Sequence, residues 1–129
     1  PLQLQSFAKQ LLELCDYFAS HAPPLIFCGE PASVVVDGWG SRHAVVKVSL
    51  VGVGSILQAS RTRCGAVDMA GRLSGFMGPE CYSGSATPLS GLYCIGLLLV
   101  HAVTGQHPAD LPRARAGVDV QTALAGTRW

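Results

Sequence analysis

The sequence predicts a mainly α-helical domain of the α+β class, with one small β-hairpin and a central buried helix. Three observations indicate this fold: an amphipathic stretch at residues 2–20, two β-branched runs within residues 25–52, and a continuous apolar stretch within residues 87–104. The chain has 129 residues, the length of one ordinary domain. We therefore expect a single packed unit.

The first predicted element is a helix over residues 2–20. Pro23 and Pro24 follow it, and a residue that precedes proline is pushed out of the helical conformation. Apolar residues recur at spacings of three and four, which is typical of a helix packed on one face. This stripe consists of Leu4, Phe7, Ala8, Leu11, Leu12, Leu14, Cys15 and Phe18.

A β-hairpin is predicted next, from β-branched runs at residues 34–36 and 44–48. The residues between them, Asp37-Gly38-Trp39-Gly40-Ser41, are typical of a short irregular loop. Residues 52–75 contain several glycines and little periodicity beyond a short apolar patch at residues 55–57. We expect this second segment to be mostly irregular.

The apolar run at residues 89–103 predicts a long helix buried on all sides. Thr87 is expected to cap it with Pro88 at the first helical position, and Gly105 to end it. The run is shorter than the roughly 18 to 20 residues that span a bilayer, so no membrane span is expected. Residues 105–129 are predicted to form a loop and tail with weak helical character near the end.

The composition is apolar: 49% of the residues are hydrophobic and 13% are charged, whereas charged residues make up about a quarter of an ordinary soluble domain. Part of the surface is therefore expected to face other protein subunits, although an excess of Ala, Val and Gly would give the same figures. The net charge is +1 and the arginines are scattered, so no nucleic-acid partner is indicated. Because the chain begins at Pro1, we expect it to be a piece of a longer protein.

The five cysteines contain no Cys-x-x-Cys pair, so neither a zinc knuckle nor a thioredoxin-type redox motif is supported. Buried free thiols are the expected state, which suits a reducing, intracellular compartment. The four histidines share no metal-ligand spacing, so neither a metal nor a cofactor is expected. The cysteines are Cys15, Cys28, Cys64, Cys81 and Cys94.

Three runs resemble the large lobe (C-lobe) of protein kinases. Residues 75–80, Gly-Phe-Met-Gly-Pro-Glu, are similar to the end of a kinase activation segment. Residues 86–96 resemble the start of the buried helix after it, and residues 104–108 the Thr-Gly-x-x-Pro that ends that helix. The resemblance covers residues 4–112 and is absent between Gly52 and Gly75. Its structural residues here are Gly52, Gly75, Pro79, Glu80, Gly96, Gly105 and Pro108.

The resemblance implies that residues 1–129 form a partial kinase-like C-lobe. Within it, residues 2–20 correspond to a helix, 25–52 to a degenerate catalytic loop and hairpin, and 53–80 to an activation-segment-like stretch. The buried helix then covers residues 87–104. No Gly-rich nucleotide loop and no strand with the phosphate-pairing lysine are visible in the sequence.

The kinase catalytic residues are missing from this pattern. Where kinases have His-Arg-Asp, a hydrophobic residue, Lys-Pro, any residue and Asn, this chain has the shorter Phe27-Cys28-Gly29-Glu30-Pro31-Ala32-Ser33. Gly29 has no side chain to accept a proton, and Ser33 is a poor substitute for the metal-binding Asn. The Asp-Phe-Gly motif is represented by Leu50-Val51-Gly52, which lacks the carboxylate that holds magnesium.

Glu30 is an alternative acid–base residue, but a lone loop carboxylate is more often solvated than catalytic. Gly91 replaces an aspartate that in kinases hydrogen-bonds the catalytic loop. Glu80 pairs with an arginine in that family, and Arg113, Arg115, Arg128 or a residue outside this chain is its expected partner. We therefore predict a chain that is not an enzyme.

The sequence favours a non-catalytic pseudokinase fragment that acts as a scaffolding subunit of a larger assembly, with no small-molecule substrate. Two alternatives remain open: a regulatory pseudokinase that binds an active kinase, and an ATP-binding unit completed by a missing N-lobe. Residues 104–112 are similar to serine/threonine kinases of bacterial, especially cyanobacterial, type. A plastid location, as in a chloroplast complex, is expected on that ground.

Overall fold

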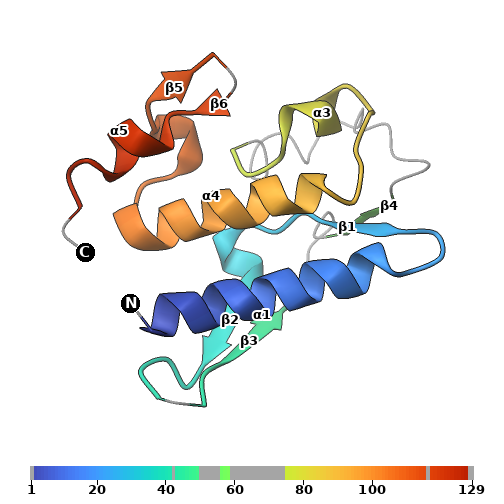
Figure 1. Ribbon diagram of the computed structural model, residues 1–129, viewed down its shortest axis with the longest axis horizontal. Helices are drawn as coiled ribbons and strands as arrows, with labels where there is room; N and C mark the ends of the chain where they lie inside the picture. The colour runs from blue at the N-terminus through green and yellow to red at the C-terminus, as the bar shows by residue number, and fades with distance from the viewer. Residues whose placement is uncertain (1, 42, 50–55, 59–74, 116, 128–129) are drawn as a thin grey trace.

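The computed structural model describes residues 2–41, 43–49, 56–58, 75–115 and 117–127 (Figure 1). These residues form an α+β fold, as the sequence predicts. The helices are α1 (Leu2–Ala19), α3 (Pro79–Tyr82), α4 (Ser90–Thr104) and α5 (Val120–Leu124), with short 3₁₀ turns η1 (Pro31–Ser33) and η2 (Pro108–Asp110). The strands are β1 (Leu25–Phe27), β2 (Val34–Asp37), β3 (Val45–Val48), β4 (Ile56–Gln58), β5 (Arg113–Ala114) and β6 (Gly117–Val118).

Helices α1 and α4 lie side by side and enclose the main core (Figure 1). The predicted apolar stripe of α1 faces this core, which confirms the expected helix and its orientation, although Leu12 is 46% exposed. Strand β1 follows α1 directly and contacts both helices. The buried residues of this core are Phe7, Leu11, Cys15, Phe18, Phe27, Phe76, Cys94, Ile95, Leu97 and Leu98.

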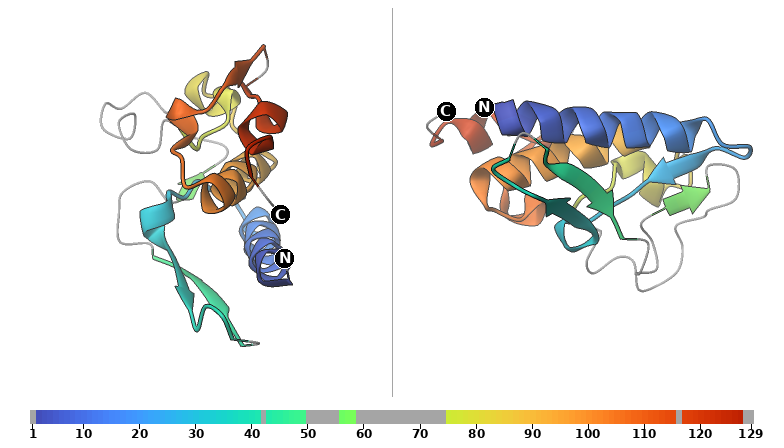
Figure 2. Two further views of the ribbon diagram at one scale, coloured as in Figure 1. Left: turned by 90° about the vertical axis from the view of Figure 1, so that its left-hand side faces the viewer. Right: turned by 90° about the horizontal axis from the view of Figure 1, so that it is seen from below.

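The predicted hairpin is confirmed: β2 and β3 pair antiparallel, with Val34 opposite Val48 and Val36 opposite Val46. These four valines are half-buried and pack against the main core, while the alternate residues face outward. The hairpin projects beside α1, away from the C-terminal elements (Figure 2, left). The position of the hairpin brings Ser49, just after β3, close to Ser33 in the loop that follows β1.

A second strand pair corrects the sequence prediction. Strands β1 and β4 pair antiparallel, with Ile26 opposite Leu57. Strand β4 falls in the segment that was expected to be irregular, and β1 was not expected as a strand. Each has three residues, which is too short for an alternating pattern to be visible in the sequence.

Helix α4 differs from its prediction in two respects. Its regular part begins at Ser90, and Thr87 does not cap it through its side chain; instead the backbone N–H of Thr87 donates to Oγ of Ser90 at 3.1 Å. The helix is also not buried on all sides, because Leu92 is 46% exposed and Gly96 is exposed as well. An all-apolar helix therefore leaves one face uncovered. Its predicted end at Gly105 is confirmed, with φ of 70°.

The C-terminal segment is more ordered than the expected loop and tail. Strands β5 and β6 form a two-residue antiparallel pair, with Arg113 opposite Val118. Asp119 then caps α5, since its Oδ1 accepts from the backbone N–H of Thr122 at 3.1 Å. Helix α5 packs against α4.

Among the residues described, none of the helices combines the length and the apolar character needed to cross a lipid bilayer.

Candidate functional site

The segment that the resemblance places at the kinase catalytic loop is buried against the main core. Phe27 is 1% exposed, and its ring stacks on that of Phe18 of α1 at a centroid distance of 6.5 Å. Cys28 and Gly29 are buried as well. Cys28 belongs to a second apolar cluster with Ile26, Met77, Cys81 and Ala86. The segment is thus packed between α1, α3 and α4.

Gly29 leaves no room for a side chain. A Cβ atom built at Gly29 would lie 2.6 Å from Cζ of Phe27, which is closer than real Cβ atoms approach, and 3.0 Å from Cε2, which is tight. The Phe27 ring therefore occupies the volume where a side chain at position 29 would begin. Because Phe27 is buried and stacks on Phe18, moving its ring aside would disturb the packing of the core.

The thiol of Cys94 in α4 binds the main chain of the loop and helps to hold the loop in place. Its thiol donates to the carbonyl oxygen of Gly29 at 3.1 Å, and both groups are buried. Burial raises the pKa of Cys94 to about 12, so the thiol stays protonated and available as a donor. The sequence does not single out Cys94 for this site, because nothing in its local pattern separates it from an ordinary core residue.

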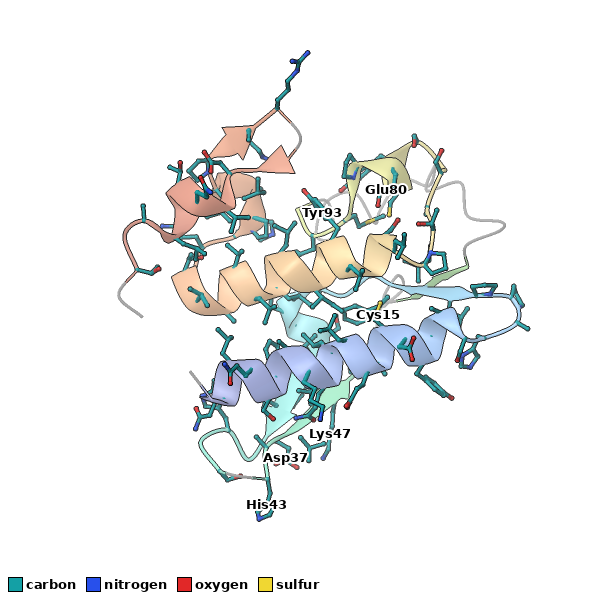
Figure 3. The ribbon with its side chains drawn as sticks, viewed as in Figure 1. Cys15, Asp37, His43, Lys47, Glu80 and Tyr93 are labelled. Carbon is teal, nitrogen blue, oxygen red and sulfur yellow. The ribbon has the colours of Figure 1, made fainter. Side chains whose placement is uncertain are left out.

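Gly91 permits the close approach of α4 to α1 and β1. A Cβ atom at Gly91 would lie 2.8 Å from Sγ of Cys15 and 3.5 Å from the carbonyl oxygen of Phe27. Figure 3 shows Cys15 in the space between the two helices. Burial, and secondarily the nearby Asp16 carboxylate, raise the pKa of Cys15. Gly91 therefore lies against the Phe27 carbonyl, and the Cys15 thiol occupies the space that a side chain at position 91 would need.

Ser33 uses its hydroxyl within its own turn. The Oγ atom accepts from the backbone N–H of Glu30 at 3.1 Å and donates to the Glu30 carbonyl oxygen at 2.9 Å. The Ser33 carbonyl accepts from the backbone N–H of Ser49 at 2.7 Å. The end of β3 therefore lies beside the loop, although Leu50, Val51 and Gly52 themselves are outside the described residues.

The Glu80 carboxylate lies against its own helix, and part of the expectation for its ion pair stays a prediction. A Cβ atom at Gly78 would lie 2.5 Å from Oε1 of Glu80, so this carboxylate lies close to the start of its own short helix. In the described part of the chain the ion pairs are Lys9–Glu13 and Lys47–Asp37, and neither Arg113 nor Arg115 pairs with Glu80. Arg128 lies outside the described residues.

The other expected structural residues divide into two groups. Gly75 lets His107 approach, since a Cβ atom there would lie 2.6 Å from Cε1 of His107, and the His107 and Phe76 rings meet edge to face at 5.2 Å. Pro108 is fully buried beside them. In contrast, Pro79 is exposed, and a Cβ atom at Gly96 would meet nothing within 4 Å.

The thiols agree with the sequence prediction where the structure describes them. Cys15, Cys28, Cys81 and Cys94 are buried and form no disulfide, while Cys64 lies outside the described residues. Within the described ranges, no three His, Cys, Asp or Glu residues gather as a metal-binding group. The contacts described around Gly29 are packing contacts and hydrogen bonds, and glycine itself has no side chain to accept a proton.

Comparison with known proteins shows a similarity to a serine/threonine kinase. Over 106 residues, which is 81% of this chain, the sequence is 26% identical to a rice (Oryza sativa subsp. japonica) protein described as a probable serine/threonine-protein kinase WNK6. The chain spans 22% of the length of that protein. No family model matches the sequence, and no solved structure matches it. Most of the chain is thus similar in sequence to part of a serine/threonine kinase.

Proposed function

We propose that this chain is a non-catalytic, pseudokinase-like unit that serves as a structural subunit of a larger protein assembly. The observation that carries the proposal is the Phe27 ring, which fills the space of a side chain at Gly29. A kinase-type general base must reach the substrate hydroxyl from this position. Gly29 offers no such group, and the packing around it is closed to one.

The contacts around Gly29 support a structural role. The loop packs near the start of α4, through Phe27 and through the Cys94–Gly29 hydrogen bond. The end of β3 meets the loop at Ser33. These contacts preserve a fold without supplying catalytic groups, which supports a structural role over an enzymatic one.

Exposed apolar side chains support contact with other subunits. Leu89, just before α4, is 72% exposed, Leu92 on the uncovered face of α4 is 46% exposed, and Val120 of α5 is 41% exposed. Apolar residues that gather on one face are typical of protein interfaces. We therefore expect partner proteins, and we expect neither a nucleic acid nor a small-molecule substrate.

Two measurements test this proposal, one on the native particle and one on the isolated chain. Native mass spectrometry of the particle that contains the chain should show it at fixed stoichiometry with other subunits. Incubation of the isolated chain with labelled ATP, magnesium and protein substrates should give no phosphate transfer. Transfer that depends on this chain, or a chain that travels alone in its native extract, would reject the proposal.

The similarity to a kinase favours one alternative, an ATP-binding unit completed by an N-lobe, because the matched rice protein is a longer chain. Nucleotide binding to the full-length protein with and without magnesium distinguishes it from the structural role. A regulatory pseudokinase is the other alternative, and it predicts an active kinase among the co-purifying chains. The bacterial-type likeness stays a prediction. The plastid location stays a prediction too, and localisation of the tagged protein would test it.

A further inference from the structure

An open groove lies between α1 and the free edge of β3; we call it the α1–β3 groove. It is lined by Gln10, Glu13, Leu14 and Tyr17 of α1 and by Val46 and Val48 of β3, and its volume is about 480 Å³. In the described residues β3 pairs with β2 alone, so its other edge has no neighbouring strand. The groove therefore combines an apolar floor with an unpaired strand edge.

The side chain of Gln10 shows which way this edge points. Its Nε2 donates to the carbonyl oxygen of Ala44 at 3.0 Å, and its Oε1 accepts from the backbone N–H of Val46 at 2.9 Å. One amide group thus binds the strand edge as a neighbouring strand would. The main-chain N–H of Val46 points away from β2, toward Gln10. In an antiparallel pair every second residue turns its main-chain groups to the same edge, so those of Val48 point away from β2 too. The two hydrogen bonds of Gln10 do not involve the carbonyl of Val46 or the N–H of Val48.

Charge distinguishes the occupants that would fit. Glu13 lines the groove, and Asp16 is exposed one turn further along α1. No Lys, Arg or His residue lines it. Glu13 contacts Lys9 at 3.7 Å, but both side chains are well exposed, and such pairs are worth little. The groove has an apolar floor, and the Glu13 carboxylate lies among its lining residues. This combination complements an apolar segment that carries a positive charge.

We propose that the α1–β3 groove binds an extended segment of a partner protein, with alternating apolar residues and one basic residue. The segment adds a strand to β3 at Val46 and Val48, its apolar side chains pack on Leu14 and Tyr17, and its basic residue meets Glu13. This mode combines main-chain hydrogen bonds with side-chain specificity. It rests on the proposed role as a subunit of a protein assembly and names one surface through which that role is performed.

The test uses the full chain and a fluorescein-labelled peptide of sequence Gly-Val-Arg-Val-Thr-Val-Gly, followed by fluorescence anisotropy. We expect saturable binding that Glu13→Lys weakens about threefold to tenfold, the size expected for reversing one exposed charge. The matched control Asp110→Lys reverses an exposed charge on η2, outside the groove, and should leave the affinity unchanged. A peptide with proline in place of its central valine lacks a main-chain donor and should bind more weakly.

Amide hydrogen exchange provides a second readout. The N–H of Val48 should exchange more slowly with the peptide bound, and the N–H of Val46, already bonded to Gln10, should change less. Absence of binding, equal binding by Glu13→Lys and Asp110→Lys, or unprotected Val48 would each overturn the inference. So would self-association of the chain through this groove. If the chain still resides in its native particle, only the groove inference fails; phosphate transfer by the chain would instead reject the proposed function.

Discussion

Restoring an aspartate at position 29 is expected to damage the fold without creating an enzyme. In Gly29→Asp the Cβ atom would start 2.6 Å from the Phe27 ring, and Phe27 is 1% exposed. Forcing extra atoms into a packed core costs about 1–3 kcal/mol. A buried carboxylate without a partner adds about 1–3 kcal/mol more even when its pKa shifts to limit the charge. The sum is a large part of the roughly 5–15 kcal/mol that stabilises an ordinary domain.

Urea unfolding followed by circular dichroism measures this cost, with two controls that separate its parts. Gly29→Ala tests the steric part alone and should lose about 1–2 kcal/mol, since alanine recovers some entropy of the unfolded chain. Gly96→Ala places the same methyl group on an exposed helical position with nothing within 4 Å, and should be neutral or stabilising by up to about 1 kcal/mol.

A double variant then identifies the neighbour responsible. Phe27→Leu removes ring atoms from above Gly29, so Gly29→Ala should cost less in that background, with a coupling of about 1 kcal/mol. If Gly29→Ala and Gly96→Ala have the same stability, or if Gly29→Asp is as stable as the native chain, the reasoning about Phe27 is refuted. Phosphate incorporation by Gly29→Asp would refute the prediction that this single change does not restore catalysis, which rests on the separate loss of the magnesium-binding carboxylate.

Three further predictions concern the thiol, the hairpin and its surface pair. Burial raises the pKa of Cys94 from an ordinary 9.0 to about 12, so stability that is complete below pH 9 should fall as the pH rises toward 12; urea unfolding should show a smaller fall for Cys94→Ser than for the native chain. Gln10→Ala removes two hydrogen bonds to the β3 edge and should cost about 1–3 kcal/mol, whereas Gln5→Ala on the exposed side of α1 should not; equal values would contradict the bridging role. The Lys47 ammonium, which donates to Asp37 at 2.9 Å, lowers the pKa of that carboxyl below its ordinary 3.8, so this contribution is present above pH 3.8 and lost as the pH falls further. Carboxyl NMR titration should show the Asp37 pKa rising in Lys47→Ala, and an unchanged value would argue against the pair.

Local patterns were sufficient where one element carries its own signal. The stripe of α1, the β-branched runs of the hairpin and the left-handed Gly105 are each visible within a few residues, and each prediction is confirmed. Strands β1 and β4 were missed because three residues give too little pattern, and their pairing joins positions about thirty residues apart. The exposed face of α4 was missed for a related reason: an all-apolar sequence does not reveal which side a neighbour leaves uncovered.

The candidate site shows the same division. The sequence by itself determined that position 29 carries no proton acceptor, because the absence of a side chain is a covalent fact about glycine. Only the tertiary structure decided what fills that space, since Phe27 is held there by Phe18 of α1, and the loop carbonyl is held by Cys94 of α4. The Cys94–Gly29 bond joins residues 65 positions apart, and the Phe18–Phe27 stack depends on how α1 packs against the following segment. No local pattern encodes either arrangement.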